Sequence, residues 1–101
     1  MASRLSLQSM LEEILGSRNV YFDPPPSVQM KYDAIRYSRS NIQNTHANDS
    51  VYTQRNRYEL VAIYEDPDSE LPLKLSKLPM CRHDRHYKAD NLNHDVFTLY
   101  Y

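Results

Sequence analysis

The stretch VYTQRNRYELVAIYE (residues 51–65) decides the fold of this chain. Polar and apolar residues alternate in its first half, and five apolar residues then follow one another at positions 60–64. Alternation is typical of a strand with one buried face, and a continuous apolar run is typical of a strand that is buried on both faces. The stretch therefore predicts the central strand of a sheet.

A second strand is predicted upstream, at residues 30–38 (MKYDAIRYS). Ile35 and Tyr37 fall on one face of this strand, and Ala34 and Arg36 fall on the other. Residues 39–50 (RSNIQNTHANDS), which separate it from the central strand, are almost entirely polar and rich in Asn and Ser. This composition predicts a long projecting loop, since a tight hairpin turn needs far fewer residues.

Two more strands are predicted at residues 82–88 and 94–101, joined by a turn at ADNLN (residues 89–93). Asp and Asn favour turns because they tolerate left-handed backbone and hydrogen-bond to nearby backbone groups. The segment after the first helix, SRNVYFDPPPSVQ (residues 17–29), contains three consecutive prolines. Prolines fix φ and donate no hydrogen bond, so we expect a stiff extended connector there.

Two amphipathic helices are predicted. Five apolar residues lie at i, i+3, i+4, i+7 and i+8 and form one stripe of the first helix: Leu7, Met10, Leu11, Ile14 and Leu15. Gly16, the only glycine, follows directly and suits a left-handed C-terminal cap.

The second helix carries Leu71, Leu75 and Leu78 on one face. Its start is fixed by Pro72, which is tolerated in the first turn but not in a helix interior. We therefore expect Ser69 as N-cap, a first helical residue at Glu70 and an end at Pro79. Together the elements predict one α+β domain over residues 1–101, with an antiparallel, mostly four-stranded sheet packed by an N-terminal helix and a second short helix.

Composition disfavours several classes of protein. The 12 basic and 13 acidic residues give a net charge of −1, which provides no general attraction for nucleic acid or an anionic membrane. No apolar run approaches the ~20 residues that span a bilayer, and the N-terminal residues lack the apolar core of a signal peptide, so we expect a soluble protein made in the cytoplasm. Cys81, the only cysteine, is expected to be a small buried apolar residue, and the nine tyrosines are expected to serve protein contacts at the surface.

The segment CRHDRHYKADNLNHD (residues 81–95) concentrates three of the four histidines, and it allows either a metal or acid/base site or a polar hairpin. Ligands on a strand must be two residues apart to share a face, whereas His83 and His86 are three apart and should point to opposite sides. Cys81 and His83 do share a face, but two ligands do not complete a tetrahedral site. The segment also misses the pattern of a calcium loop. An acid/base pair of His86 with Asp84 or Asp95 stays open, although no other catalytic signature accompanies it.

The polar hairpin is the interpretation that we favour, and it predicts no catalytic residue, metal ligand or cofactor. The alternative is a small metal-dependent enzyme that uses the His/Asp cluster. It would require side chains from this segment to converge: Cys81, His83, His86, Asp90, His94 or Asp95.

Three stretches resemble a family of small proteins encoded among the head and tail genes of long-tailed bacteriophages, described as minor capsid, tail-completion or tail-terminator proteins. They are LEEILGSRNVYFDPPPSVQMKY (11–32), RNRYELVAIYEDPDSELPLKLSKLP (55–79) and DRHYKADNLNHDVFTLYY (84–101). The resemblance covers nearly the whole chain, from Leu7 to Tyr101.

The resemblance implies a tail-terminator-like α+β fold and a structural, non-enzymatic role in the virion tail or neck, with assembly in the host cytoplasm. A terminator forms a hexameric ring that caps the tail tube and meets the head-completion (stopper) protein, while phage DNA passes through without specific binding. Another neck or head–tail connector protein is the alternative. We expect the interface with a neighbouring subunit or the tube to include ten residues: Asp84, Arg85, His86, Tyr87, Asp90, Asn91, Asn93, His94, Tyr100 and Tyr101.

Overall fold

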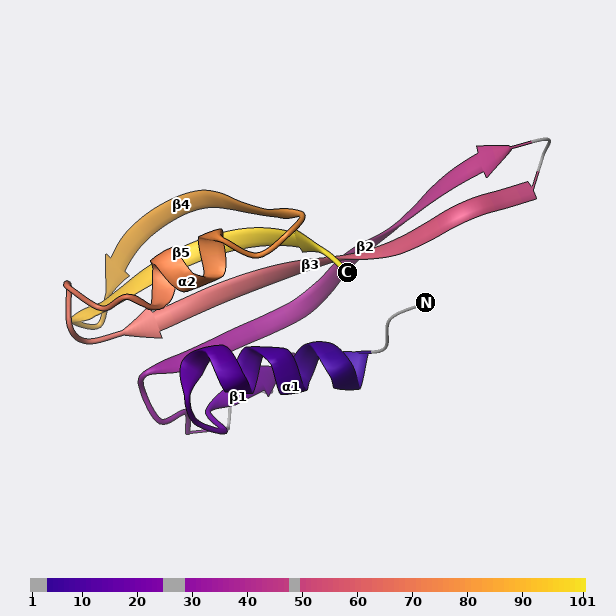
Figure 1. Ribbon diagram of the computed structural model, residues 1–101. Helices are drawn as coiled ribbons and strands as arrows, with labels where there is room; N and C mark the ends of the chain where they lie inside the picture. The colour runs from indigo at the N-terminus through magenta and orange to yellow at the C-terminus, as the bar shows by residue number, and fades with distance from the viewer. Residues whose placement is uncertain (1–3, 25–28, 48–49) are drawn as a thin grey trace.

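A computed structural model describes residues 4–24, 29–47 and 50–101, and for residues 41–47 and 50–55 it describes the backbone only. The elements in chain order are α1 (Arg4–Leu15), β1 (Val20–Phe22), β2 (Ala34–Ala47), β3 (Ser50–Tyr64), α2 (Leu71–Ser76), β4 (Cys81–Ala89) and β5 (Leu92–Tyr100). They form a five-stranded sheet in the order β1-β2-β3-β5-β4 with two helices (Figure 1). The α+β class is confirmed.

The sheet is mixed, because β1 runs parallel to β2 while the other neighbours are antiparallel. The prediction of a mostly four-stranded antiparallel sheet was therefore wrong. The segment predicted as a connector supplies the fifth strand, since the Ile35 N–H donates to Asn19 O over 3.0 Å and the Asp23 N–H donates to Tyr37 O over 2.8 Å. Val, Tyr and Phe favour extended backbone, so the residues that lead into the prolines suit a short edge strand.

The central-strand prediction is confirmed. β3 lies between β2 and β5, and all five residues at positions 60–64 are buried. Even-numbered residues in this run face the helices, and Val61 and Ile63 face the opposite side of the sheet. Both faces of β3 are thus covered where the sequence is apolar on both faces.

Helix α1 packs through the predicted stripe. Leu7 and Leu11 are fully buried, while Met10, Ile14 and Leu15 pack at the edge of the core. Gly16 adopts a φ of +80° and its N–H donates to Glu12 O over 2.9 Å, which is the left-handed helix end that the sequence predicts.

Helix α2 begins at Leu71, one residue later than predicted, with Glu70 in the N-cap position. The Ser69 hydroxyl accepts from the Leu71 N–H over 3.3 Å, so this serine still satisfies a backbone donor at the helix start. Pro72 lies in the first turn, as its missing N–H requires, and the helix ends at Ser76.

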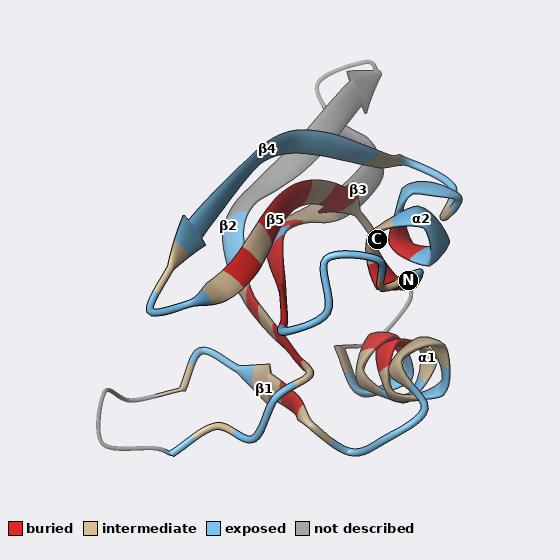
Figure 2. Ribbon diagram, turned by 90° about the vertical axis from the view of Figure 1, so that its left-hand side faces the viewer, coloured by how far each residue is buried: buried red, intermediate tan, exposed pale blue. Residues whose placement is uncertain are grey.

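Both helices cover the same face of the sheet (Figure 2). The main core lies between the helices and this face of the sheet. It contains Leu7, Leu11, Val20, Ile35, Tyr37, Tyr58, Leu60, Ala62, Tyr64, Leu71, Leu75, Phe97 and Leu99. Three tyrosines are in this list, so the expectation that tyrosines serve the surface was wrong for them. Tyr37, for example, is 1% exposed and donates from its hydroxyl to Gln8 Oε1 of α1.

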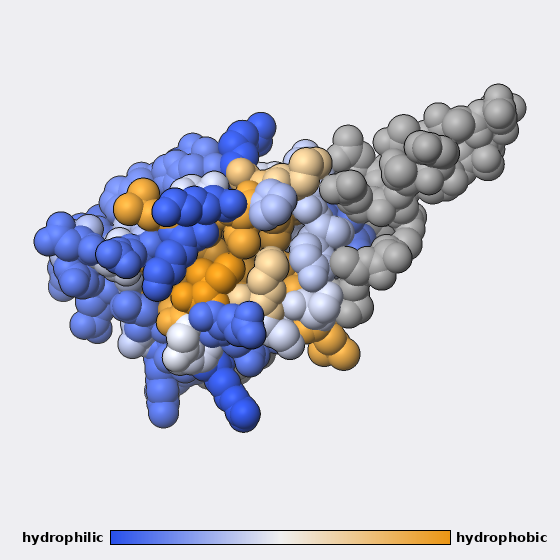
Figure 3. Space-filling model, viewed as in Figure 1, coloured by the Kyte–Doolittle hydropathy of each residue, from blue (hydrophilic) through white to orange (hydrophobic). Residues whose placement is uncertain are grey.

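The opposite face of the sheet has a small second core. Val61, Ile63 and Val96 are buried there, with Met30 and Leu92 packed against them. On the helical face, Figure 3 shows a band of hydrophobic residues bordered by hydrophilic ones. Among the described residues, no helix is long and apolar enough to cross a bilayer.

The hairpin of β2 and β3 extends far beyond the rest of the sheet (Figure 1). The two strands stay paired out to Ala47 and Ser50, so residues 39–47 and 50 form strand backbone and the predicted loop was wrong. Residues 48 and 49 lie outside the described part. In the described residues, β1 pairs with β2 at residues 35–37, and β5 together with the following Tyr101 pairs with β3 at residues 56–64. We call residues 41–47 and 50–55 the arm, which gives the molecule its 51 Å length against 26 and 23 Å across.

Candidate functional site

The β4–β5 hairpin carries most of the predicted interface residues. Its turn contains two residues, Asp90 with φ 53° and Asn91 with φ 62°, which is the type I′ geometry of tight hairpins. The predicted five-residue turn was too long, because Leu92 and Asn93 already belong to β5. Asp and Asn at the turn do explain its polarity, as predicted.

Asn91→Gly should raise the free energy of unfolding by about 0.5–1 kcal/mol, because glycine adopts a positive φ without steric cost. Chemical denaturation of the two proteins measures this difference. A matched Asp68→Gly substitution, in an exposed loop where no positive φ is present, should not stabilise the protein. An Asn91→Gly protein that is less stable than wild type would contradict the turn geometry.

Strand β4 contains an irregularity that changes which side chains share a face. His83 pairs with Phe97 and Arg85 pairs with Val96, so β4 has one residue more than β5 in this interval. Such a β-bulge shifts the alternation of side chains by one position. The prediction that His83 and His86 point to opposite sides was therefore wrong, because it assumed a regular strand.

Both histidines instead reach the same oxygen of Asp95. His83 Nε2 lies 2.8 Å and His86 Nδ1 lies 3.0 Å from Asp95 Oδ1, and the Tyr64 hydroxyl donates to Asp95 Oδ2. Asp95 is only 4% exposed, whereas the His83 and His86 side chains are nearly half exposed. We call these four residues the histidine–aspartate cluster.

The cluster stabilises a buried negative charge. Burial by itself would raise the pKa of Asp95, but hydrogen bonds from Tyr64, His83 and His86 outweigh it, and the pKa lies below the usual value. Burial also raises the pKa of Tyr64, and its hydrogen bond to the Asp95 carboxylate raises it further. Tyr64 therefore remains a protonated donor and Asp95 an ionised acceptor at neutral pH.

The other face of the hairpin carries a second polar group. Asp84, within the bulge, accepts from the Thr98 hydroxyl over 2.5 Å and from Arg82 Nε over 3.1 Å. The Thr98 hydrogen bond is the main cause that lowers the pKa of Asp84, with Arg82 adding to it against partial burial. Nearby, the rings of Tyr87 and His94 stack with centroids 4.7 Å apart.

The ten predicted interface residues differ in exposure. Six are exposed, namely Asp84, Arg85, His86, Tyr87, Asp90 and Asn91, and three are partly exposed, namely His94, Tyr100 and Tyr101. Asn93 is buried, and its amide faces Tyr64 O and Glu65 O at 3.5 and 3.4 Å. Asn93 thus holds the β3 end in place and offers no surface to a partner.

The histidine–aspartate cluster and the nearby residues do not have the features of a metal site or of a nucleophilic site. Among the described residues, no group of three or more His, Cys, Asp or Glu side chains has the geometry to hold a metal ion. Asp90 and His94 do not join the cluster, since Asp90 is in the turn and His94 Nδ1 lies 3.1 Å from Leu92 O. Cys81 is half-buried, and burial, with Asp84 nearby, raises its pKa to about 11, so its thiol is a poor nucleophile.

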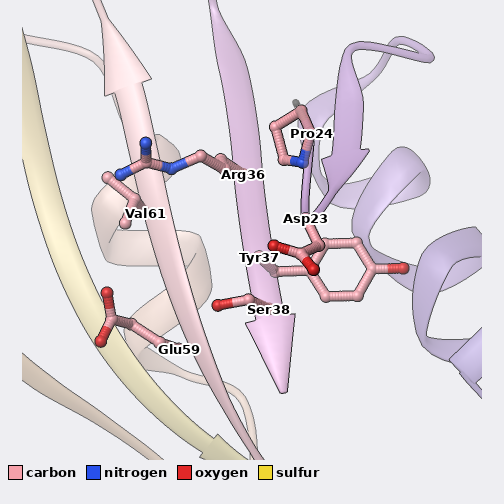
Figure 4. A pocket seen from close by; sticks show the side chains of 7 residues that line it. All are labelled: Asp23, Pro24, Arg36, Tyr37, Ser38, Glu59 and Val61. Carbon is pink, nitrogen blue, oxygen red and sulfur yellow. The ribbon is translucent and has the colours of Figure 1, made fainter. Parts of the chain in front are cut away.

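A pocket of about 240 Å³ lies on the sheet face that the helices leave open (Figure 4). It is lined by Asp23, Pro24, Arg36, Tyr37, Ser38, Glu59 and Val61. In the register, Arg36 lies opposite Val61 and Ser38 lies opposite Glu59, so β2 and β3 form its floor. No local sequence pattern indicated this site, because Asp23 joins it only through the pairing of β1 with β2.

Comparison with protein-family models and with curated proteins found no match to this chain. The fold and its surfaces therefore carry the functional argument.

Proposed function

We propose that this chain is a structural protein of a tailed-bacteriophage virion, and specifically a tail terminator. Its copies would form a closed hexameric ring that caps the tail tube and meets the head-completion protein. The resemblance in sequence suggests this role, and the structural observation that supports the role is the arm. The α+β fold is compatible with a terminator-like architecture.

The arm is built for contact with another chain. In the described backbone it consists of two strands that pair only with each other, and a two-stranded ribbon is marginally stable in water without further support. At about 3.3 Å per residue, residues 41–47 extend roughly 20 Å from the body. Both outer edges carry backbone groups that can pair with a strand of a neighbour. A second copy or a tube subunit is the partner that supports such an arm.

A ring follows from the way identical subunits associate. When one surface of a subunit contacts a different surface of the next, the contact repeats from copy to copy, and it forms a ring where the rotation between copies closes on itself. A closed ring can match the last ring of the tube on one side without reproducing that surface on the other. Tube growth would then stop at this ring.

The role requires no catalysis and no specific DNA recognition. A net charge of −1 is compatible with DNA that passes through the ring, because strong binding depends on many neutralised phosphates. The histidine–aspartate cluster has a structural task in this proposal, which is to hold edge strand β4 against β5.

Particles assembled without this protein should carry tails of uncontrolled length, or tails that fail to join heads. Electron microscopy of such particles, with and without the protein supplied from a plasmid, measures both outcomes. Tails of uncontrolled length support the terminator, whereas tails of normal length that do not join heads support another neck protein. Normal tails joined to heads would rule out both roles.

A further inference from the structure

The outer edge of β2 continues into the arm beyond the strand that covers it in the body. In the described residues, the pairing of β1 with β2 ends at Tyr37, where the Asp23 N–H donates to Tyr37 O over 2.8 Å. On its inner side, β2 stays paired with β3 out to Ala47. Residues 41–47 therefore form an edge strand with one side open to another chain.

The register shows which residues turn their backbone groups toward this open side. Asn56 and Tyr101 exchange both backbone hydrogen bonds, over 3.2 and 3.0 Å, so the backbone groups of Asn56 point away from β2. In an antiparallel ladder the residue opposite then also points away from its partner, and Ile42 lies opposite Asn56. Because the direction alternates along a strand, Asn44 and His46 turn outward as well.

This edge lacks the usual protection against the addition of a strand. Charged side chains, prolines and bulges are the features that normally guard an edge. The sequence of residues 41–47, NIQNTHA, contains no Lys, Arg, Asp, Glu or Pro, and the irregularity near the tip places its extra residue, at position 52, in β3. At the other edge of the sheet, β4 is guarded by its bulge and by four charged residues, namely Arg82, Asp84, Arg85 and Lys88.

We propose that two copies of the chain pair through this edge, β2 against β2, about a two-fold axis at Asn44. An antiparallel edge is complementary to itself, because residues related by the axis exchange N–H and C=O groups. With the axis at this position, Asn44 pairs with its own copy and Ile42 pairs with the partner's His46. Each outward residue then gains both of its backbone hydrogen bonds.

A second copy fits this edge without obstruction. Figure 1 shows that the arm projects away from the helices and from the other strands. In the antiparallel pair the two arms lie side by side and the two bodies lie at opposite ends, so neither body blocks the strands. No like charges meet, since residues 41–47 carry none. Two ribbons of two strands become one sheet of four, which supplies the support that a single ribbon lacks.

This pair goes beyond the proposed ring. An isologous contact is complete with two copies, so it is the form that we expect of the free chain in dilute solution. In the proposed ring, a neighbouring subunit or the tube takes the place of the second arm.

Proline substitutions at one cross-strand pair of the arm test which edge is used. Asn44→Pro removes the outward N–H of β2 and leaves the β2–β3 ladder intact, and Gln54→Pro does the same at the β3 edge, because these two residues lie opposite each other. In dilute solution, Asn44→Pro should weaken dimerisation at least about tenfold, since both central hydrogen bonds are lost. Gln54→Pro is the matched control and should dimerise like wild type. Sedimentation over a range of concentrations measures all three proteins, and thermal unfolding confirms that each is folded.

Cross-linking tests the position of the two-fold axis. Residues that exchange both backbone hydrogen bonds have Cα atoms about 5.5 Å apart, a distance that a disulfide can join. In a chain with Cys81→Ala, Asn44→Cys should therefore form a disulfide-linked dimer on mild oxidation. Gln54→Cys should not, because three strand spacings, about 14 Å, separate the two copies of this residue.

Four results would each overturn the pair: an Asn44→Pro protein that dimerises like wild type, a Gln54→Pro protein that is weakened as strongly, an Asn44→Cys protein that does not cross-link, or a wild type that is monomeric at every concentration below ring assembly. The tail-length experiment judges the virion role separately, since it does not depend on how free copies pair.

Discussion

Removing the arm should abolish assembly of the proposed ring while the domain stays folded. In the variant, residues 43–55 are replaced by Asn-Gly, which joins the cross-strand partners Ile42 and Asn56 through a type I′ turn. Every core residue identified in the described chain lies outside the deleted segment. A two-stranded ribbon contributes little stability of its own, so the thermal midpoint should change by only a few degrees.

The control is Asp49→Gly, which gives the full-length chain the same Asn-Gly sequence at positions 48 and 49. Sedimentation should show rings for the control and only monomer for the shortened chain, and only the control should restore normal particles. Circular dichroism and thermal unfolding confirm the fold of both. A shortened chain that assembles and restores particles like the wild type would remove the arm from the proposed function.

Asp95→Ala should have the largest effect on stability. It removes the acceptor of the buried Tyr64 hydroxyl and of both histidines, and it leaves a vacancy beneath β4. An unpaired buried hydroxyl and a lost charge-assisted network together cost about 2–4 kcal/mol. A domain of this size has a total stability of about 5–15 kcal/mol, so the loss is a large part of it.

Asp84→Ala is the matched control on the same hairpin, because Asp84 also accepts two hydrogen bonds but its side chain is 26% exposed, against 6% for Asp95. Exposed ion pairs contribute little, so it should cost less than about 1 kcal/mol. Denaturant unfolding at neutral pH measures both variants. Equal losses for the two substitutions would contradict the buried role of Asp95.

The same carboxylate should make stability depend on pH. The pKa of Asp95 is lower in the folded chain, so its contribution is fully present above about pH 3.9, the ordinary aspartate value, and is lost as the pH falls through the lower folded pKa. The Asp95→Asn protein has no ionisable side chain at this position, so it should lack this part of the acid-induced loss of stability. Denaturant unfolding of both proteins above and below about pH 3.9 tests this prediction. As the pH falls, the free energy of unfolding should decrease more for wild type than for the Asp95→Asn protein.

Much of the fold could be predicted from local sequence patterns. The apolar run at residues 60–64 identified a strand buried on both faces, and the leucine spacing identified α1 and α2. These features are predictable because each reflects burial of a regular element. Pro72 placed the start of α2 to within one residue, because its missing N–H allows it only in the first turn.

The arm and β1 could not be predicted from the local pattern of hydrophobic residues. The arm extends beyond the sheet, where alternation between a core face and a solvent face is not required, so its Asn- and Ser-rich sequence was interpreted as a loop. β1 has only three residues, and its partner in β2 is far along the chain. Its extended backbone was anticipated, but its parallel pairing was not.

The histidine–aspartate cluster depends on two facts that the sequence did not show. One extra residue in β4 shifts the side-chain phase, so a spacing of three places His83 and His86 on one face. The third partner, Tyr64, is 31 residues from Asp95 and meets it only because β3 and β5 are neighbours. A bulge in an edge strand has no strong local sequence signal. The spacing of His83 and His86 therefore predicted opposite faces, as it would in a regular strand.

The proposed virion role is tested most directly by protein mass spectrometry of tailed particles purified from the cells that produce this chain. We expect the chain in every tailed particle, at a fixed copy number equal to that of one ring, and at the junction of tail and head when particles are labelled with an antibody. Particles that lack the chain, although infected cells contain it, would contradict the proposal.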